Sequence, residues 1–207
     1  MRERALEGLV TGCLLLGVAG VGAARDFTPL FDGKTLDGWT TAPGGSWEVK
    51  DGVIVGTSPK TERRHGMLLS EKKYGDFVLR LKFKSLKGNS GLYFRAERVN
   101  RPVTVNGFQA EIAPSGPVGG LYETGGRAWV VKPDAELLKG CFKPGDWNEM
   151  TVTAQGKDIT VRLNGTTTAE LKNDPGRLAG HFGLQLHGGN EMHVEFKDIE
   201  IQGKPKE

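Results

Sequence analysis

Two pairs of polar residues, each pair two positions apart, are the best candidates for chemistry in this sequence. In the first, Gln109 and Glu111 alternate with the apolar Phe108, Ala110 and Ile112. Successive side chains of a β-strand point to opposite faces, so we expect the amide and the carboxylate on one face and the apolar side chains on the other. A carboxylate held there can accept a hydrogen bond from a ligand, or a proton. The plainer interpretation is the solvated outer face of a strand.

The second pair is Gln185 and His187, and Leu184 and Leu186 point the other way. An imidazole changes its charge near neutral pH, which suits it to act as an acid or a base. Gly188-Gly189 follows directly and would let a ligand come close. The pattern therefore predicts a second polar face suited to a ligand, with an ordinary surface histidine as the alternative.

An arginine and a glycine-rich bend add candidates for binding. Arg95 is expected on the same strand face as Tyr93, where its guanidinium could bind sugar oxygens or an enolate. Tyr122, Glu123 and Arg127 surround a bend and are predicted to form a substrate-binding loop over the rim of the face. The alternative for both groups is an exposed ion pair, which contributes little to stability.

The sequence leaves open whether the protein uses a divalent metal ion as a cofactor. Glu191 and His193 stand close in sequence to His187 and could join Glu111 around an ion, although the spacing alone does not establish a site. The sequence contains no Ser-His-Asp nucleophile pattern, no phosphate-binding glycine loop and no Cys/His zinc spacing. The net charge of +3 is dispersed, and nucleic-acid binding would need a basic stripe that is not present.

The elements that must position these residues are β-strands. In Phe77–Lys84, apolar residues alternate with basic ones, as in a half-buried strand. Met150–Ala154 and Ile159–Leu163 repeat the alternation, and Asn164-Gly165 is a strong hairpin signal. Near the end the phase changes, which a bulge at Lys197-Asp198 would explain.

Helical signals are almost absent. Only Pro133–Lys139 is predicted to form a helical turn or two. The 31 glycines among 207 residues are about twice the ordinary share of about 7%, and they are spread along the chain as turns between strands would be. Many short strands without βα alternation predict an all-β, two-sheet antiparallel jelly-roll sandwich.

The amino-terminal segment differs in composition from the rest of the chain. Arg2 and Arg4 precede an apolar run, and small residues lead up to Ala24, as in a signal peptide covering residues 1–23. We therefore expect one domain, residues 24–207, exported to the periplasm or secreted and free of the membrane after cleavage. A buried helix or a membrane anchor is the alternative. Most of the apolar run follows Cys13, which argues against a lipoprotein.

Removal of residues 1–23 takes away two basic and two acidic residues and leaves the net charge at +3. The mature chain then keeps a single cysteine, Cys141, so it cannot form an internal disulfide. We expect Cys141 to be a small core residue rather than a nucleophile.

Several local sequences, in this order and spacing, resemble one family. They are Phe27–Trp39, Trp47–Val49, Gly88–Arg95, Gly107–Ile112, Gly119–Glu123, Trp147–Glu149, Leu163–Gly165, Gly183–Gly188 and Val194–Ile199. Together they cover nearly all of the mature chain and resemble the 3-keto-disaccharide hydrolase domain, whose fold is a concanavalin A-like jelly roll. Many members carry the acid two positions earlier than Glu111, so Gln109 and Glu111 stand here in the opposite order.

The resemblance implies a carbohydrate substrate, a glycoside already oxidised to a ketone at C3. The ketone acidifies the C2 proton, and the glycosidic oxygen on C1 is then a β leaving group. Such an enzyme needs one base, one group that stabilises the enolate and one acid. The candidates are Glu111 or His187 as base, Arg95 or a metal ion as stabiliser, and Gln109 and Gln185 as orienting amides.

Two other functions remain open on the sequence alone. A non-catalytic carbohydrate-binding domain would use the same concave face with amides and aromatic rings. A purely structural exported β domain would use none of these groups. Convergence of Glu111, His187 and Arg95 in one pocket would favour the enzyme, and turnover of a 3-keto glycoside would decide. The oligomeric state cannot be predicted from these patterns.

The signal-peptide interpretation predicts that the mature protein begins at or near Ala24. Mass spectrometry of the protein recovered from the exporting cell measures this end directly. A product that begins at an acylated Cys13, or an uncut Met1, would contradict it.

Overall fold

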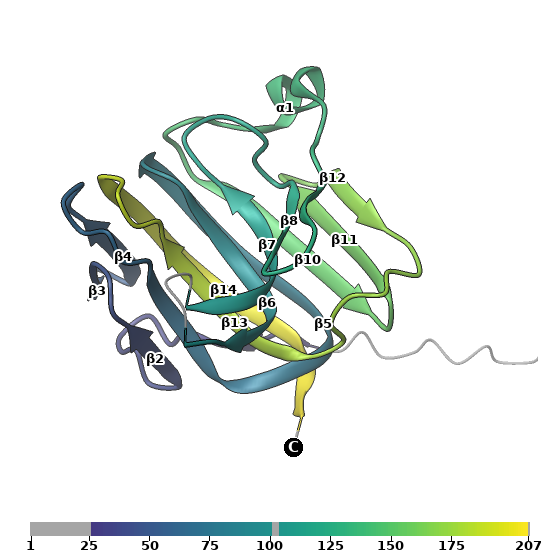
Figure 1. Cartoon of the computed structure of the whole chain (residues 1–207), viewed down its shortest axis with the longest axis horizontal. Coiled ribbons are helices and arrows are strands. Elements are labelled where there is room, and N and C mark those ends of the chain that lie inside the picture. The colour runs from purple at the N-terminus through teal and green to yellow at the C-terminus, as the bar shows by residue number, and fades with distance from the viewer. Residues whose placement is uncertain (1–25, 101–103, 207) are drawn as a thin grey trace, which may run out of the picture.

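The computed structural model describes residues 26–100 and 104–206, so the predicted signal peptide of residues 1–23 lies outside the described residues. The described chain is built almost entirely of antiparallel strands, arranged as two sheets packed face to face (Figure 1). This architecture confirms the predicted all-β sandwich. No helix within the described ranges is long and apolar enough to cross a membrane.

The first sheet carries the strands that will matter for the site. Its strands pair in the order β2, β5, β13, β6, β7, β8 and β9. Their bounds are β2 Trp39–Ala42, β5 Gly66–Lys87, β13 Gly180–Leu186, β6 Ser90–Arg98, β7 Val105–Ile112, β8 Leu121–Thr124 and β9 Ala128–Val131.

The second sheet covers the inner side of the first. It contains β12 Thr166–Leu171, β11 Asp158–Leu163, β10 Asn148–Gln155, the same β5, β14 Met192–Lys206, β4 Val53–Ser58, β3 Ser46–Lys50 and β1 Thr28–Pro29. The one helix of the described residues is α1, Ala135–Cys141, which stands at one end of the sandwich (Figure 1).

β5 belongs to both sheets. Residues 66–74 pair with β13 and residues 77–83 pair with β10, while β14 runs along residues 73–87. The prediction of short strands is therefore wrong for β5, which is 22 residues long. Because its two halves pair with different partners, the strand connects the two layers, which the periodicity of its sequence could not reveal.

The core lies between the sheets and follows the predicted alternation. Phe77, Leu79, Leu81 and Phe83 of β5 are all buried, and so are the apolar positions of β10 and β11. From the first sheet, β6, β7 and β13 contribute residues including Leu92, Phe94, Phe108, Ala110, Ile112, Leu184 and Leu186. Cys141 is buried at the edge of this core, as expected for a structural residue.

Local signals in the sequence are also confirmed. Asn164 and Gly165 both have positive φ, 48° and 83°, in the tight turn that joins β11 to β12. Asp198 has φ 52°, and the pairing of β14 with β5 shifts between Lys197 and Glu200, which is the predicted bulge. α1 begins two residues later than predicted, because Asp134 caps it by accepting from the backbone N–H groups of Glu136 and Leu137.

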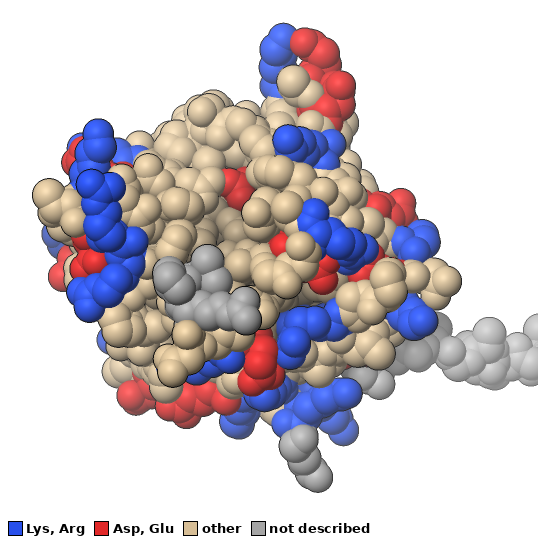
Figure 2. Space-filling model, in the orientation of Figure 1, with Lys and Arg blue, Asp and Glu red and all other residues tan. Residues whose placement is uncertain are grey.

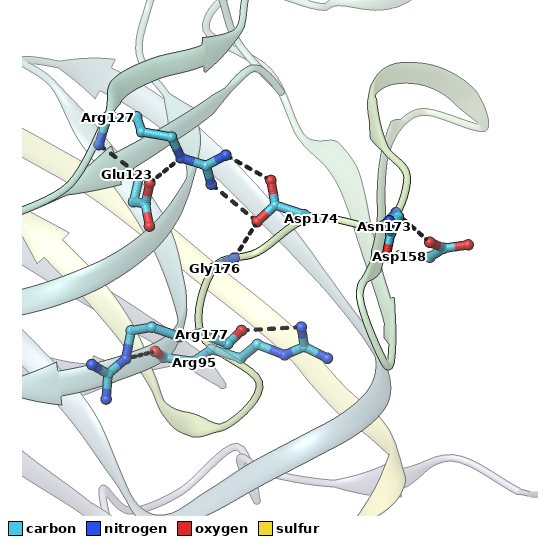
Figure 3. A network of polar contacts seen from close by, with 8 residues as sticks. All are labelled: Arg95, Glu123, Arg127, Asp158, Asn173, Asp174, Gly176 and Arg177. Atoms are coloured by element: carbon cyan, nitrogen blue, oxygen red, sulfur yellow. Dashed lines mark hydrogen bonds and ion pairs between the residues drawn. The ribbon is translucent and has the colours of Figure 1, made fainter.

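The loop of residues 172–179 crosses from β12 of the second sheet to β13 of the first, and we call it the crossing loop. Arg127 Nη1 and Nη2 donate to the two carboxylate oxygens of Asp174 at 2.8 and 3.0 Å, and Gly176 N donates to Asp174 at 2.8 Å (Figure 3). A Cβ on Gly176 would come within 2.5 Å of the Phe108 ring, so this loop lies directly on the core. Arg127 therefore ties β8–β9 to the crossing loop.

Burial alone would raise the pKa of Asp174, but hydrogen bonds from Arg127 and Gly176 hold it below its ordinary value. A lowered pKa means that Asp174 stabilises the fold when it is ionised, above its unfolded pKa, and that this contribution is lost as the pH falls through the folded pKa. The Asp174 carboxylate is 6% exposed and its partner Arg127 is 42% exposed, so solvent screens the pair only in part.

We predict that Arg127→Ala lowers the free energy of unfolding at pH 7 by about 1–3 kcal/mol, because a buried carboxylate loses its charged donors. The difference should begin to shrink toward about pH 3, as the pH falls toward the lowered folded pKa of Asp174 and its carboxylate starts to be protonated. Urea unfolding at the two pH values measures it. Lys172→Ala, which removes an exposed pair to Asp158 and Glu170, is the control and should leave the free energy of unfolding nearly unchanged.

Candidate functional site

The outer face of the first sheet holds a cavity of about 320 Å³. In Figure 2 this face is hollowed among uncharged atoms, with Lys and Arg side chains standing on either side. The residues that line the cavity come from five strands and three loops: His65, Asn89, Tyr93, Gln109, Glu111, Tyr122, Thr124, Trp129, Gln185 and His187. Its volume is at the lower end of the range for small-molecule sites, about 300–1,000 Å³.

Glu111 lies in the cavity wall and is only 4% exposed. Gln109 Nε2 donates to its Oε2 at 3.0 Å, and Asn89 Nδ2 donates to its Oε1. Burial raises the pKa of Glu111 to about 7, although the hydrogen bond from Asn89 lowers it. At neutral pH this carboxyl group can therefore both hold and release a proton.

The predicted same-face placement of Gln109 and Glu111 is confirmed, and a glycine makes room for it. Gly91 pairs with Glu111 across β6 and β7, and a Cβ there would come within 2.4 Å of the Gln109 amide. The Gln109 amide therefore fills the space that a side chain at position 91 would take. From that position it also donates to Ser90 O at 3.2 Å and to Gln185 Oε1 at 3.3 Å.

A chain of polar contacts continues from Gln109 across the floor of the cavity. Gln185 Nε2 donates to the Tyr93 hydroxyl at 3.3 Å, and that hydroxyl lies 2.8 Å from Thr124 Oγ1. Burial raises the pKa of the Tyr93 hydroxyl well above its usual range, so it stays neutral. The floor therefore offers neutral donors and acceptors on β6, β7, β8 and β13.

Two imidazoles meet on the other side of the cavity. The rings of His65 and His187 pack edge to face with centroids 4.4 Å apart. His187 Nδ1 lies 2.8 Å from Gly188 O, which accepts, and 3.0 Å from Asn190 Nδ2, which donates, so these two contacts engage Nδ1 without fixing the tautomer of the ring. Burial, and to a lesser extent His187, lower the pKa of His65, which is thus the neutral ring of the pair at neutral pH.

The His65 ring is held by contacts between two loops. Gly188 N donates to His65 Nδ1 at 3.5 Å, and Gly189 N donates to Glu62 O at 2.6 Å. A Cβ on Gly188 would come within 2.2 Å of Arg63 O, so only glycine allows the two backbones to approach this closely. We call residues 59–65 the His65 loop.

Two aromatic rings form the remaining wall. Tyr122 of β8 and Trp129 of β9 pack edge to face with centroids 5.4 Å apart, and both line the cavity. The Lys132 ammonium lies 5.1 Å from the centroid of the Trp129 ring. Rings of this kind give a sugar an apolar surface to stack on.

The structure does not bring Arg95 to the cavity, and the prediction that it shares the face of Tyr93 is wrong. Arg95 has φ 49°, and the pairing of β6 with β7 shifts between Phe94 and Glu97, so the alternation is broken at this point. Its guanidinium is buried and donates to Gly75 O and to the carbonyl of Arg177 in the crossing loop (Figure 3). Arg95 thus holds that loop rather than a ligand.

The rim candidates divide between the cavity and its surroundings. Tyr122 lines the cavity, whereas Glu123 and Arg127 pair with each other and Arg127 extends to Asp174.

The residues suggested as metal ligands do not come together in residues 26–100 and 104–206. Glu191 pairs with Lys87 and His193 with Glu195, and within these ranges no three His, Cys, Asp or Glu residues come together as metal ligands would.

The cavity also contains residues that sequence reasoning did not single out: His65, Asn89, Tyr93, Thr124 and Trp129. Asn89 and Tyr93 stand inside Gly88–Arg95, one of the segments that carry the family resemblance, and that position was a usable signal. His65 reaches the cavity from a loop far from Glu111 in the sequence, whereas Trp129 is brought there by its pairing with Tyr122 in the β8–β9 hairpin. The local sequence pattern shows neither.

Comparison with known proteins identifies the family. Residues 26–202 match the family described as the 3-keto-alpha-glucoside-1,2-lyase-like domain, and the chain belongs to this family. No curated protein matches the sequence. The family match confirms the resemblance seen in the local sequences.

Solved structures share the fold. A "putative glycosyl hydrolase" of Parabacteroides distasonis ATCC 8503 superposes with a TM-score of 0.64 and 20% identity, covering 86% of this chain and 94% of the other. A second structure from the same organism gives 0.64 and 24%, with 86% and 100% covered. The carbohydrate-binding module CBM66 of Bacillus subtilis gives 0.63 and 17%, with 80% and 96% covered. At these identities the likeness concerns the fold alone.

The raised pKa of Glu111 predicts how stability depends on pH. Between the ordinary value of 4.5 and about 7 the folded protein binds more protons at Glu111 than the unfolded chain, so stability falls as the pH rises. The full loss is about 3 kcal/mol. Glu111→Gln cannot titrate, so its stability relative to the wild type should rise by up to this amount between pH 5 and 8. Urea unfolding of both proteins measures the difference, and parallel profiles would contradict the raised pKa.

Proposed function

We propose that this member of the 3-keto-alpha-glucoside-1,2-lyase-like family cleaves the glycosidic bond of 3-keto glycosides, beginning with removal of the C2 proton. The observation that carries the proposal is Glu111: a buried carboxyl group in a cavity of sugar-ring size, with its pKa raised to about 7. A general base works best when its pKa lies near the working pH.

The reaction follows from the ketone. A base takes the proton from C2, and the electrons of the C–H bond form a C2=C3 double bond while the C3 oxygen becomes an enolate. The enolate then re-forms the ketone, a C1=C2 double bond appears, and the C1–O bond breaks. The aglycone oxygen takes up one proton and leaves as an alcohol. Addition of water across C1=C2 would complete a net hydrolysis.

Glu111 is the base in this proposal. A carboxylate has about four lone-pair sites, and Asn89 and Gln109 occupy one on each oxygen, so each oxygen keeps a site for the C2 proton. The two donors also fix the orientation of the carboxyl plane. The raised pKa makes the ionised form a stronger base than an ordinary surface carboxylate.

Neutral donors take the role of enolate stabiliser that the sequence suggested for Arg95. Gln185 uses one N–H on Tyr93, and its second N–H has no acceptor in the described part of the chain. Together with the neutral Tyr93 hydroxyl it can donate to the developing C3 oxyanion. Donors already fixed in place need little reorganisation during the reaction.

His187 is the acid that protonates the leaving oxygen. Its Nδ1 is engaged with Gly188 O and Asn190 Nδ2, so Nε2 is the nitrogen left to meet the leaving oxygen. His65, held neutral beside it, limits the pair to one positive charge. Tyr122 and Trp129 provide the surface against which the sugar ring stacks.

A second candidate is a non-catalytic carbohydrate-binding domain. The aromatic wall and the amide floor would suit it equally well, and CBM66 has the same fold. A binding domain has no need of a carboxyl group with a raised pKa, which favours the enzyme. We also propose that the protein acts after export, since residues 1–23 have the pattern of a signal peptide.

The proposal predicts separate effects for the base and the acid. Glu111→Gln should lower the turnover of a 3-keto glucoside by about 10²–10⁴-fold and abolish exchange of its C2 proton with deuterated solvent. His187→Asn should slow release of the aglycone while C2 exchange continues, because the base is intact. NMR follows both processes in one sample.

His193→Asn is a matched control, since this imidazole lies on β14 outside the cavity and pairs with Glu195. It should leave both processes unchanged. Exchange lost in His187→Asn and kept in Glu111→Gln would reverse the two roles. Binding of 3-keto sugars by the wild type without any turnover would leave the carbohydrate-binding domain as the function.

A further inference from the structure

An apolar groove of about 650 Å³ lies next to the cavity and has no part in the chemistry proposed above. It runs between α1 and the loop of residues 113–120, which connects β7 to β8. Its lining is mainly proline and apolar side chains: Pro114, Pro117, Pro133, Leu138, Phe142 and Pro144. Lys132 and Lys139 also line it, and none of the described lining residues is acidic.

The backbone connects this groove to the proposed base. Pro114 follows Glu111 by three residues, a path of at most about 10 Å. The same loop folds back on Glu111, because Gly119 N donates to Glu111 O at 2.9 Å and Glu111 N donates to Gly120 O at 3.0 Å. The groove therefore lies just beyond the end of β7 that carries Glu111.

A side-chain contact connects the two spaces a second time. Trp129 lines the cavity, Lys132 lines the groove, and the Lys132 ammonium lies over the Trp129 ring. In the described residues no carboxylate pairs with Lys132. Figure 1 agrees with this continuity, since α1 stands at the end of the sandwich beyond β7 and β8.

We propose that the groove binds the aglycone of the substrate, and that this aglycone is an aromatic, largely apolar alcohol rather than a second sugar. This inference rests on the proposed function and names its substrate class. The sugar occupies the cavity at Glu111, and the part beyond the glycosidic oxygen extends past Trp129 and Lys132 into the groove.

The chemistry of the lining decides between an aromatic ring and a sugar. A second sugar would place several hydroxyl groups against proline and phenylalanine side chains, where they would lose their hydrogen bonds to water. An aromatic ring buries apolar surface there and presents its face to the Lys132 ammonium, as Trp129 already does. The groove volume lies in the range that accommodates such ligands, about 300–1,000 Å³.

The test compares two 3-keto-α-glucosides that differ only beyond the glycosidic oxygen, one with a methyl and one with a 2-phenylethyl aglycone. Both leaving groups are simple primary alcohols of similar acidity, so the chemical step itself is matched. We expect kcat/KM to be at least about tenfold higher for the 2-phenylethyl compound, because its ring is buried in the groove.

Ala135→Glu places a charge in the groove without disturbing the fold. Ala135 lines the groove at the exposed first position of α1, where an acidic residue is favourable to the helix. This variant should remove the preference for the 2-phenylethyl compound and leave the methyl compound unchanged. Leu137→Glu is the matched control, because Leu137 is exposed on the same helix and does not line the groove.

The outcomes distinguish failure of the proposed aglycone groove from failure of the proposed function. Turnover of both compounds at equal rates would overturn the aglycone groove and leave the proposed function intact. A preference that Ala135→Glu and Leu137→Glu reduce equally would also overturn it. If neither compound is turned over, the proposed function fails, and dissociation constants from calorimetry decide on the groove. Equal affinities for the two sugars would then exclude it as well.

Discussion

The pairing of β5 with both sheets is the constraint on which the rest of the structure depends. Its first half pairs with β13 and its second half with β10 and β14, so the register of one sheet sets that of the other. Once the inner positions of β6, β7 and β13 are packed into the shared core, their outer positions must face the other way. The polar residues of the cavity gather there because the core has taken every alternate position.

Burying polar groups on an outer face requires that each has a partner. The amides and hydroxyls form a continuous series of contacts, in which each group holds the next in place: Gln109, Gln185, Tyr93 and Thr124. For Glu111, hydrogen bonds do not fully offset the free-energy cost of burying the ionised carboxylate, and its pKa is raised as a result. The fold thus tolerates a carboxyl group with a raised pKa, at the position where the proposed function requires a base.

Periodicity predicted the sandwich, the core positions and the two same-face pairs, because alternation along a strand is a local property. It also predicted the bulge near Lys197 and the Asn164 turn. Arg95 shows where this reasoning fails: a bulge with positive φ reverses the face, and nothing in the local pattern reveals it. His65 could not be predicted for a different reason, since only the packing of a loop distant in sequence brings it to Glu111. Trp129 depends on the register of the β8–β9 hairpin, which places it beside Tyr122.

The His65 loop is attached differently from the strands that hold Glu111. Its contact with the Gly188-Gly189 turn consists of one backbone hydrogen bond, one hydrogen bond from the backbone to the His65 ring and a close approach of glycine, outside the main core. Loosening of this loop would separate the two imidazoles while both sheets remain folded. Inactivation and denaturation are then different events in this protein. A preparation can keep its full circular dichroism spectrum and its solubility after heating or storage and still contain molecules in which His65 no longer packs against His187.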